Sequence, residues 1–333
     1  MKAIALLSGG LDSTVAARVI QEQGLEVVGV NFKTAFGTRP QQKNGAARDR
    51  AQEAAQNLKI ELKSIDISQE FLKLLTGPRH GFGSNMNPCI DCKIMMLRQC
   101  RQLMAELGAS FVVTGEVLGQ RPMSQHRRAL NAIAKESGLE GLLLRPLSAR
   151  LLEETIPEQK GWVDRSRLLS FSGRTRTPQM QLAEQFGLTD YPGPGGGCLL
   201  TDPEFTKRLR DLLSHQALDL NHIELLKIGR HFRFSATAKL VVGRNEQENG
   251  RLLSLAQEND YLFAPVDIAG PTALGRGEFN PDLIARAAAI ICRYSDLGSR
   301  PSAEISLRIF PAEEERVLTA SPADESVFLP LKL

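Results

Sequence analysis

The stretch that decides the fold is SGGLDST, residues 8–14, which follows the short apolar run AIALL at residues 3–7. A strand, a glycine turn and a helix in succession leave unpaired backbone N–H groups at the start of the helix, where an anion is stabilised. Ser8 and Ser13 add hydroxyl groups, and the Asp12 carboxylate can orient the loop or help to hold Mg²⁺. No lysine is present to grip the β- and γ-phosphates. The loop therefore suits a pyrophosphate that leaves as a unit. The alternative is a plain strand–turn–helix in which glycine only reverses the chain.

Apolar and amphipathic runs alternate from this loop through the first two thirds of the chain. Short apolar runs predict strands at 4–7, 27–32, 61–65, 111–114 and 142–147, and amphipathic runs predict helices at 11–23, 46–58, 92–107 and 124–137. This alternation is typical of the α/β class and predicts a doubly wound parallel sheet with helices on both faces. Ligands of such sheets bind beyond the carboxyl ends of the strands.

The character of the chain changes after about residue 215. Strand-like runs at 231–235, 239–242, 261–264 and 306–310 are mixed with a helix-like run at 281–294. We therefore expect an α/β domain at 1–215 and a smaller α+β domain at 216–333.

The amino-acid composition indicates in which compartment the protein works and which classes of partner it has. The formal net charge is only +3, so bulk charge does not mark a nucleic-acid-binding protein. We expect a cytoplasmic protein with no membrane partner, because there is no signal peptide and no apolar run of about 20 residues. Five cysteines, an odd and sparse set, argue against a disulfide framework. Two of them, Cys100 and Cys292, occupy apolar helical positions and are expected in the core.

The other three cysteines stand where chemistry is expected. Cys89 and Cys92 form a CxxC pair at a predicted helix start, where the helix dipole should lower thiol pKa values, and Cys198 follows the Gly-rich loop at 189–197. Three interpretations stay open. One is a structural zinc with His80 as a spare ligand, and another is a catalytic persulfide with a resolving cysteine. The third is a [4Fe–4S] cluster held by Cys89, Cys92 and Cys198, with one iron open to a small ligand.

The loop SGGLDST resembles the signature of the PP-loop (N-type) ATP pyrophosphatases, which have the adenine nucleotide alpha hydrolase-like fold. Members of this superfamily adenylate a carbonyl oxygen and release pyrophosphate, so the resemblance implies ATP and Mg²⁺ as cofactors. It implies nucleotide binding by Ser8, Gly9, Gly10, Asp12, Ser13 and Thr14, with Asp12 also taking part in catalysis. We expect the adenine against the end of the second strand, at Asn31 and Phe32.

Motifs later in the chain indicate which members of this superfamily it resembles. The segment VTGEVLGQ at 113–120 is similar to the strand-end loop of tRNA 4-thiouridine synthetases, which implies that Gly115, Glu116 and Gln120 shape the nucleotide or uridine pocket. The CxxC pair with a distant third cysteine is similar to cluster-dependent tRNA thiolation enzymes, including the 2-thiouridine branch. Compared with the longer 4-thiouridine enzymes, we expect no THUMP-type region and no rhodanese-like domain. From about residue 220 the chain resembles the RNA-associated segment of NFACT-type proteins.

This resemblance implies tRNA thiolation in two steps. A uridine carbonyl oxygen attacks the α-phosphate of ATP, and a sulfur nucleophile at the cysteine site then displaces AMP. The product favoured is 4-thiouridine over 2-thiouridine. The partners expected are tRNA, a sulfur donor (sulfide or a cysteine desulfurase) and a second copy of the chain in a homodimer. RNA contacts are expected from basic side chains near the predicted site, namely Arg127, Arg128, Arg174 and Arg176.

Two other functions remain open from the sequence. The first is a PP-loop ligase that acts on a small molecule and would not need the three cysteines. The second is a non-catalytic RNA-binding or iron–sulfur sensing protein that retains the loop without using it.

Overall fold

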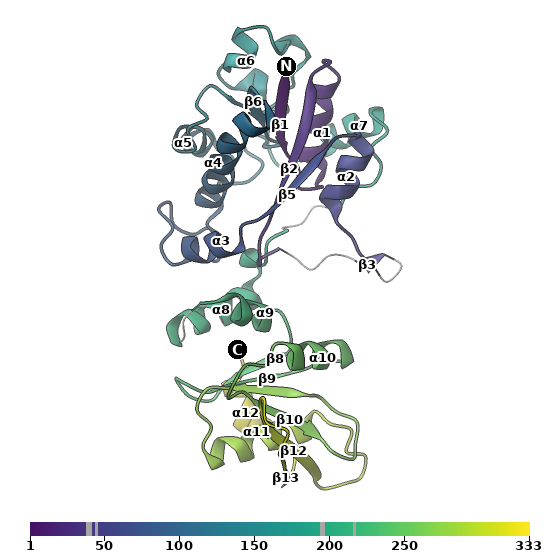
Figure 1. Cartoon of the computed structure of the whole chain (residues 1–333), viewed down its shortest axis with the longest axis vertical. Coiled ribbons are helices and arrows are strands. Elements are labelled where there is room, and N and C mark those ends of the chain that lie inside the picture. Colours follow the sequence, from purple (N-terminus) through teal and green to yellow (C-terminus); the bar gives the residue numbers. More distant parts are fainter. Residues whose placement is uncertain (38–41, 44–45, 194–196, 216–217) are drawn as a thin grey trace. The chain divides into compact units, whose positions relative to one another are not determined.

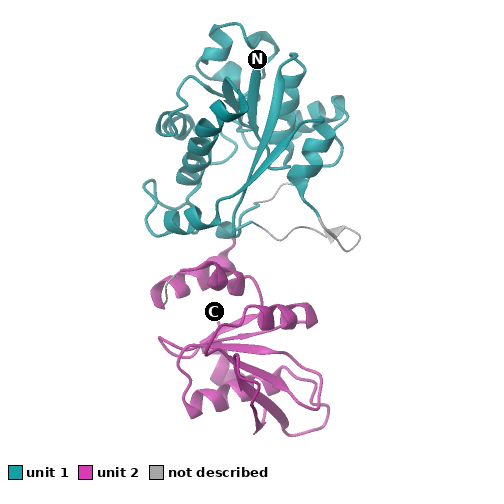
Figure 2. Ribbon diagram, viewed as in Figure 1, with its two compact units in different colours: residues 1–201 teal, residues 202–333 magenta. Residues whose placement is uncertain are grey.

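The computed structural model describes residues 1–37, 42–43, 46–193, 197–215 and 218–333. The chain divides into two compact units, Met1–Thr201 and Asp202–Leu333, which Figure 2 draws in different colours. Among the helices in the described ranges, none is both long enough and apolar enough to pass through a membrane.

The first unit is built on a five-stranded sheet in the order β5-β2-β1-β6-β7 (Figure 1). Every neighbouring pair of strands is parallel. The strands are β1 (Lys2–Leu6), β2 (Glu26–Lys33), β5 (Leu62–Asp66), β6 (Phe111–Val113) and β7 (Leu143–Leu144). The helices are α1 (Leu11–Gln21), α2 (Arg50–Leu58), α3 (Ser68–Leu75), α4 (Cys89–Leu107), α5 (Arg127–Glu136), α6 (Ile156–Gln159) and α7 (Thr177–Gln185). The predicted α/β class is confirmed.

Alternate residues of β1 point to opposite faces of this sheet. Ala3 and Ala5 belong to an apolar cluster with α1, α2 and α7, whereas Ile4 and Leu6 belong to a second cluster with α4 and α5. Helices therefore cover both faces, as the prediction of a doubly wound sheet requires. Because β2 and β6 lie on opposite sides of β1, the loops that follow β1 and β6 flank the topological switch point, where sheets of this kind bind ligands.

The elements differ from the prediction in three places. Ala46–Ala47 forms strand β4 with β3 (Gln42–Lys43), and the predicted helix at 46–58 begins only at Arg50, after its N-cap Asp49. Helix α4 begins at Cys89, so both cysteines of the CxxC pair lie in its first turn. Helix α3 was not predicted, because its short amphipathic sequence shows too few turns for a clear helical period.

The second unit is built on a six-stranded antiparallel sheet in the order β13-β12-β10-β11-β9-β8. Its strands are β8 (Arg230–Arg233), β9 (Lys239–Val242), β10 (Tyr261–Pro265), β11 (Ala273–Arg276), β12 (Ala303–Ile309) and β13 (Glu315–Ala320). Its helices are α8 (Pro203–His215), α9 (Leu220–Leu226), α10 (Glu246–Ser254), α11 (Pro281–Arg293) and α12 (Glu325–Phe328). The apolar side of α11 packs in one cluster with this sheet. The unit is α+β, as predicted.

Helix α8 lies in the second unit, whereas the predicted boundary at residue 215 assigned it to the first domain. Asp211 of α8 is bound by Arg233 of β8 at 2.7 Å and by Lys239 of β9 at 3.1 Å. All three side chains are largely buried, so these ion pairs hold α8 to the sheet. An amphipathic helix could dock on either unit, and the sequence pattern does not distinguish the two.

Candidate functional site

The loop between β1 and α1 carries Ser8, Gly9 and Gly10 at the carboxyl edge of the sheet. The Oγ atoms of Ser8 and Ser13 lie 3.1 Å apart, and the hydroxyl groups of Ser13 and Thr14 each donate to the Gly10 carbonyl at 3.0 Å. Gly10 is the N-cap of α1 and has no side chain, and no side-chain cap forms within the described ranges. The first amides of α1 therefore remain available for an anion.

Two glycines let this loop touch its neighbours. Gly9 has φ +73°, and an added Cβ would lie 2.3 Å from the carbonyl carbon of Arg50 at the start of α2. At Gly115, which follows β6, an added Cβ would lie 2.4 Å from the carbonyl carbon of Asp12 and 2.5 Å from Ser13 N. The neighbours in both cases are backbone atoms, which cannot rotate away. The loops after β1 and β6 are therefore in direct contact at the switch point.

Only one oxygen of the Asp12 carboxylate has a hydrogen-bond partner in the described part of the chain. Oδ2 accepts a hydrogen bond from Gln120 Nε2 at 2.8 Å, and Gln120 Oε1 accepts from Gln179 Nε2 of α7 at 3.4 Å. Oδ1 is buried and has no partner in the described part of the chain. Since a buried carboxylate oxygen normally has a partner, Oδ1 is suited to a cation or to a water bound to one. Gln179 was missed from the sequence because nothing in its helix marks it.

Glu116 is buried beneath this site in an ion pair with Arg145. Its Oε2 lies 3.0 Å from Arg145 Nε and accepts from the Thr114 hydroxyl at 3.0 Å, and its side chain is 1% exposed. Burial by itself would raise the pKa of the Glu116 carboxyl, but the positive charges of Arg145 and Lys93 outweigh it and hold this pKa below its usual range. The structure therefore gives Glu116 a supporting position under the loop. Arg145 was missed, although a lone charge in the apolar run LLLRPL was a usable signal.

Backbone contacts bring the Cys198 segment to two other loops. Cys198 forms a β-bridge with Gly37, just beyond β2. The 3₁₀ turn that follows, η3 (Leu199–Thr201), accepts a hydrogen bond at Leu200 O from Met86 N at 3.2 Å. Met86 lies in the loop that leads into the CxxC pair. The third cysteine is thus held between the exit of β2 and the start of α4, although residues 194–196 of its Gly-rich loop lie outside the described ranges.

The three thiols influence one another. Burial raises the pKa of the Cys92 thiol to about 12, and the charges of Cys198 and Cys89 add to the rise. Burial likewise raises the pKa of the Cys198 thiol to about 11. The lowering expected from the helix N-terminus is therefore wrong for Cys92, because loss of solvent has the larger effect. Such thiols are protonated at neutral pH, and a metal or a nearby cation is needed to hold them as thiolates.

Lys93 is a cation beside the cysteines that the sequence analysis overlooked. Its ammonium group lowers the pKa of the Cys92 thiol and also that of the Glu116 carboxyl. It has no ion-pair partner in the part of the chain that the structure describes. Its place directly after the CxxC pair was the available signal.

The described residues contain no group of three His, Cys, Asp or Glu side chains arranged to hold a metal ion. His80, the spare ligand of the zinc interpretation, lies with Nε2 3.1 Å from Glu136 Oε1. The zinc interpretation therefore loses its fourth ligand. Three soft sulfur donors in one neighbourhood still fit iron–sulfur chemistry better than that of a hard cation.

The remaining predicted residues lie around this edge. Asn31 donates from Nδ2 to the Leu7 carbonyl at 2.8 Å, and Phe32 packs against the apolar cluster on the α4 side of the sheet. Arg174 is exposed and Arg176 is partly buried, in a loop joined to the one after β6 by a hydrogen bond from Gly173 N to Leu118 O at 2.8 Å.

The two arginines at the start of α5 are both exposed. Arg127 Nη2 donates to the Leu151 carbonyl at 2.9 Å. Arg128 has no ion pair in the described part of the chain. The structure therefore places all four predicted RNA contacts in the first unit, on two separate segments.

These features define the first unit as a nucleotide-binding α/β domain of the PP-loop class. A family model described as "Thiamine biosynthesis protein (ThiI)" matches residues 1–156. Over these residues, slightly less than half of the chain, the sequence is similar to this family. A second model, "NFACT protein RNA binding domain", matches residues 229–328.

Curated relatives resemble parts of the chain. The tRNA-specific 2-thiouridylase MnmA of Xanthobacter autotrophicus is 26% identical over 244 residues, which are 69% of this chain and 59% of the relative. A probable tRNA sulfurtransferase of Thermococcus kodakarensis is 30% identical over 157 residues, which are 46% of this chain and 39% of the relative. The chain thus spans less than two thirds of the length of each of these relatives.

Solved structures resemble the chain weakly. A 4-thiouridine synthetase–RNA complex with bound ATP is 20% identical, with a TM-score of 0.40 over 56% of this chain and 41% of that one. The U34-tRNA thiolase NcsA of Methanococcus maripaludis with its [4Fe-4S] cluster is 18% identical, with a TM-score of 0.30 over 64% and 65%. Likenesses at this level carry no argument about activity.

Proposed function

We propose that the chain is an ATP-dependent tRNA sulfurtransferase. The observation that carries this proposal is the presence of two features at one edge of the sheet: an uncapped phosphate-type loop, and a CxxC pair at the start of α4 whose preceding loop is hydrogen-bonded to the turn after Cys198. The family match over residues 1–156 and the relatives named as tRNA sulfurtransferase or 2-thiouridylase support it. A small-molecule ligase would have no use for Cys198 at this edge.

In the proposed reaction ATP activates the uridine before sulfur enters. The uridine carbonyl oxygen attacks the α-phosphorus, and the bond from that phosphorus to pyrophosphate breaks. The free amides of α1 and the hydroxyl groups of Ser8 and Ser13 hold the departing pyrophosphate, and Asp12 Oδ1 faces Mg²⁺ or one of its waters. Hydrosulfide from the donor then attacks the activated ring carbon, and AMP leaves with the original oxygen.

A [4Fe–4S] cluster on Cys89, Cys92 and Cys198 is the cofactor we propose for the sulfur step. When bound, it would supply an iron with an open coordination position for a sulfur ligand. Cys89 and Cys92 in the first turn of α4 and Cys198 before η3 are the residues that would hold it. Lys93 is placed to stabilise negative charge on the Cys92 sulfur with or without the cluster.

The finer parts of the proposal concern product and partners. We favour 4-thiouridine over 2-thiouridine, with tRNA as substrate and sulfide or a cysteine desulfurase as donor. The unit that matches an RNA-binding family at 229–328 supports an RNA substrate. A cytoplasmic location and a homodimer remain predictions.

The test is a reaction of the anaerobically purified chain with ATP, sulfide and unmodified tRNA, followed by mass spectrometry of the nucleosides. We expect thiouridine with equal amounts of AMP and pyrophosphate, and loss of thiouridine in Cys89→Ala, Cys92→Ala and Cys198→Ala. The core cysteines supply matched controls, because Cys100→Ala and Cys292→Ala should retain the product.

Four results separate the alternatives. AMP and pyrophosphate formed without thiouridine, in amounts unchanged by Cys198→Ala, would favour a small-molecule ligase, and no AMP with any tRNA would favour a non-catalytic protein. The mass and retention time of the nucleoside distinguish the 4-thio from the 2-thio product. Iron analysis and visible absorption of the purified chain distinguish the cluster from a persulfide.

A further inference from the structure

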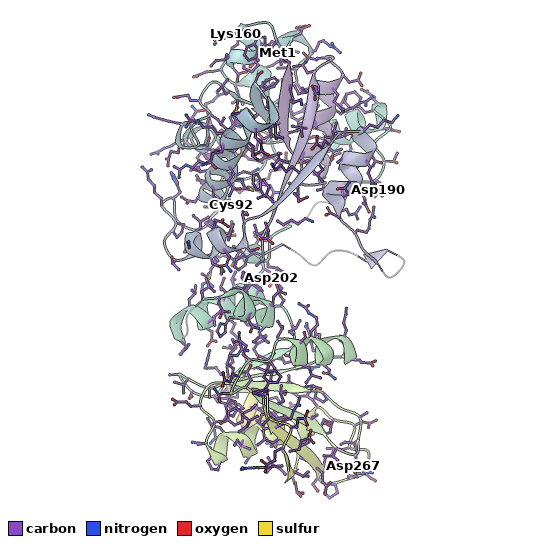
Figure 3. All side chains as sticks on the ribbon, viewed as in Figure 1. Met1, Cys92, Lys160, Asp190, Asp202 and Asp267 are labelled. Carbon is purple, nitrogen blue, oxygen red and sulfur yellow. The ribbon has the colours of Figure 1, made fainter. Side chains whose placement is uncertain are left out.

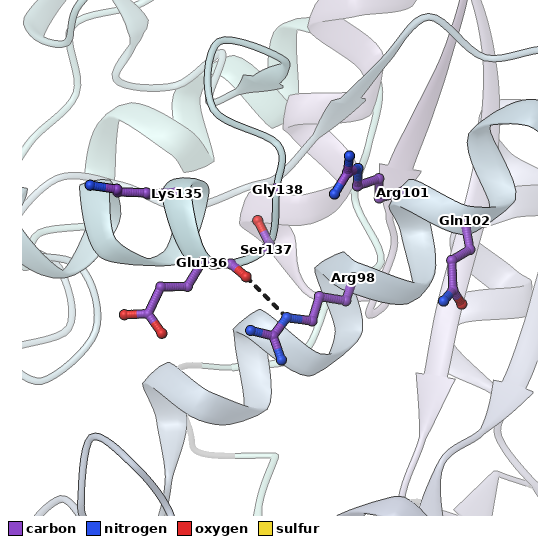
Figure 4. Close-up of a pocket in the computed structure, with 7 residues that line it drawn as sticks. All are labelled: Arg98, Arg101, Gln102, Lys135, Glu136, Ser137 and Gly138. Atoms are coloured by element: carbon purple, nitrogen blue, oxygen red, sulfur yellow. Dashed lines mark hydrogen bonds between the residues drawn. The ribbon is translucent and has the colours of Figure 1, made fainter.

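A pocket of about 600 Å³ lies between α4 and α5 in the first unit (Figure 4). Its volume is within the range of ligand sites in proteins. The pocket is lined by side chains of α4, by the end of α5 and by the turn that follows: Arg98, Arg101, Gln102, Lys135, Glu136, Ser137 and Gly138. None of these residues belongs to the nucleotide loop or to the cysteine site.

The side chains that line this pocket carry more positive than negative charge. The single carboxylate, that of Glu136, is already occupied, because Arg79 Nη1 lies 2.9 Å from Oε2 and His80 Nε2 lies 3.1 Å from Oε1. Arg101 and Lys135 have no ion pair in the part of the chain that the structure describes. The pocket therefore presents uncompensated positive charge.

One of the two arginines of the pocket is held by a backbone carbonyl, and the other lies against the turn after α5. Arg98 donates from Nε to the Glu136 carbonyl at 3.0 Å, the dashed line in Figure 4, and its terminal nitrogens have no partner in the described structure. The Arg101 guanidinium lies over Gly138, since an added Cβ there would come within 2.2 Å of Nη1. A planar guanidinium that is already positioned loses less freedom when it binds the oxygens of a phosphate.

A polar track with a cation at each end runs along α5 beside the pocket. Arg128, Asn131 and Lys135 are exposed and lie three and four residues apart, so they share one face of α5. Helices α4 and α5 both begin at the carboxyl edge of the sheet, and at 1.5 Å per residue Arg98 lies about 9 Å along α4 from Cys92. The track therefore runs from the edge that carries the cysteines to the pocket.

We propose that this pocket and its track bind backbone phosphates of the RNA whose uridine reaches the cysteine site. This inference rests on the proposed function. The open site, with cations spaced along two helices, suits a chain of phosphates, because such contacts neutralise the backbone without reading bases. An acidic peptide would meet the same charges, and that alternative is an outcome of the test.

The test compares the affinity of variants for a fluorescently labelled, unmodified tRNA transcript over a salt series. Lys135→Gln and the double variant Arg101→Gln/Lys135→Gln remove charges from the pocket. Lys160→Gln is the matched control, because Lys160 is an exposed lysine at the end of the first unit opposite Cys92 (Figure 3). The affinity falls as salt rises, and each lost phosphate contact should make the slope of log affinity against log salt shallower by about 0.8. Between about 1 M and about 0.1 M salt, a variant that lacks one contact should therefore gain about sixfold less affinity than the wild type. The control should keep the wild-type slope.

Several outcomes would overturn the inference. If the wild-type chain binds tRNA and the double variant keeps its slope, the pocket does not contact RNA, and an acidic peptide becomes the better occupant. If the variants bind ATP more weakly without RNA, the pocket serves the nucleotide instead. A wild-type chain that binds no tRNA would refute the proposed function as well. Circular dichroism checks the fold, and Lys135→Glu should weaken binding further than Lys135→Gln if charge is the cause.

Discussion

Replacing Gly115 by alanine tests whether the loops after β1 and β6 really touch. The new methyl carbon would lie 2.4 Å from the carbonyl carbon of Asp12, whereas carbon atoms in contact sit about 3.5–4.0 Å apart. An overlap of more than about 1 Å with backbone cannot be relieved by a side-chain rotation. Overpacking of this kind costs about 1–3 kcal/mol, and we expect about 3 kcal/mol here. For a unit of this size, that lowers the melting temperature by about 6–12 °C.

The assay uses the single tryptophan of the chain, Trp162, which lies in the first unit and reports its unfolding. Gly77→Ala is the control, because no atom lies within 4 Å of the Cβ position there. Displacing the loop by about 1 Å should also slow AMP formation by about 100-fold. If Gly115→Ala melts within about 1 °C of Gly77→Ala and forms AMP at the wild-type rate, the close approach and its role in the site are refuted.

Further predictions concern buried charges. Glu116→Gln should destabilise the first unit by about 3 kcal/mol in urea unfolding followed at Trp162, because it leaves the buried Arg145 guanidinium without its counterion. The double variant Glu116→Gln/Arg145→Met should recover part of this loss, and an additive loss would contradict the pairing. In the second unit, burial holds the pKa of His231 well below its usual value. Below about pH 6.5 His231 is protonated in the unfolded chain but stays neutral in the folded unit. The free energy of unfolding should therefore fall by up to about 1.4 kcal/mol per pH unit below that value. His231→Phe should remove this contribution when the second unit's calorimetric transition is compared at about pH 7 and about pH 5, and an unchanged slope would exclude His231 as its source.

The fold of the first unit follows from sequence patterns that are local. The apolar run before SGGLDST, the glycines and the alternation that follows each mark an element within a few residues, so the parallel sheet and its switch point could be predicted. The helix at 46–58 was placed too early because alanine favours helices, and the pairing of residues 46–47 with residues 42–43 overrides that local preference. Helix α8 was assigned to the wrong side of the boundary because its buried partners, Arg233 and Lys239, come later in the chain.

The candidate site was predicted less completely than the fold. Residues with unusual chemistry at a loop, such as Asp12 and the cysteines, stand out in the sequence. Their supports do not, because Gln179 and Arg145 reach the site from elements that only the folded chain brings near. The pKa of the Cys92 thiol was predicted in the wrong direction, because a helix start is visible in the sequence and the loss of water around Cys92 is not.

The short turn η3 has a mechanical consequence for the third cysteine. Thr201, the last residue of the first unit, donates to the Cys198 carbonyl from both its backbone N–H at 3.1 Å and its hydroxyl at 2.7 Å, and Asp202 opens the second unit. Two hydrogen bonds to one carbonyl oxygen close the turn on itself, so the Cys198 peptide group cannot rotate without breaking both. The orientation of the third cysteine is therefore fixed by the residues that follow it as well as by its bridge to Gly37.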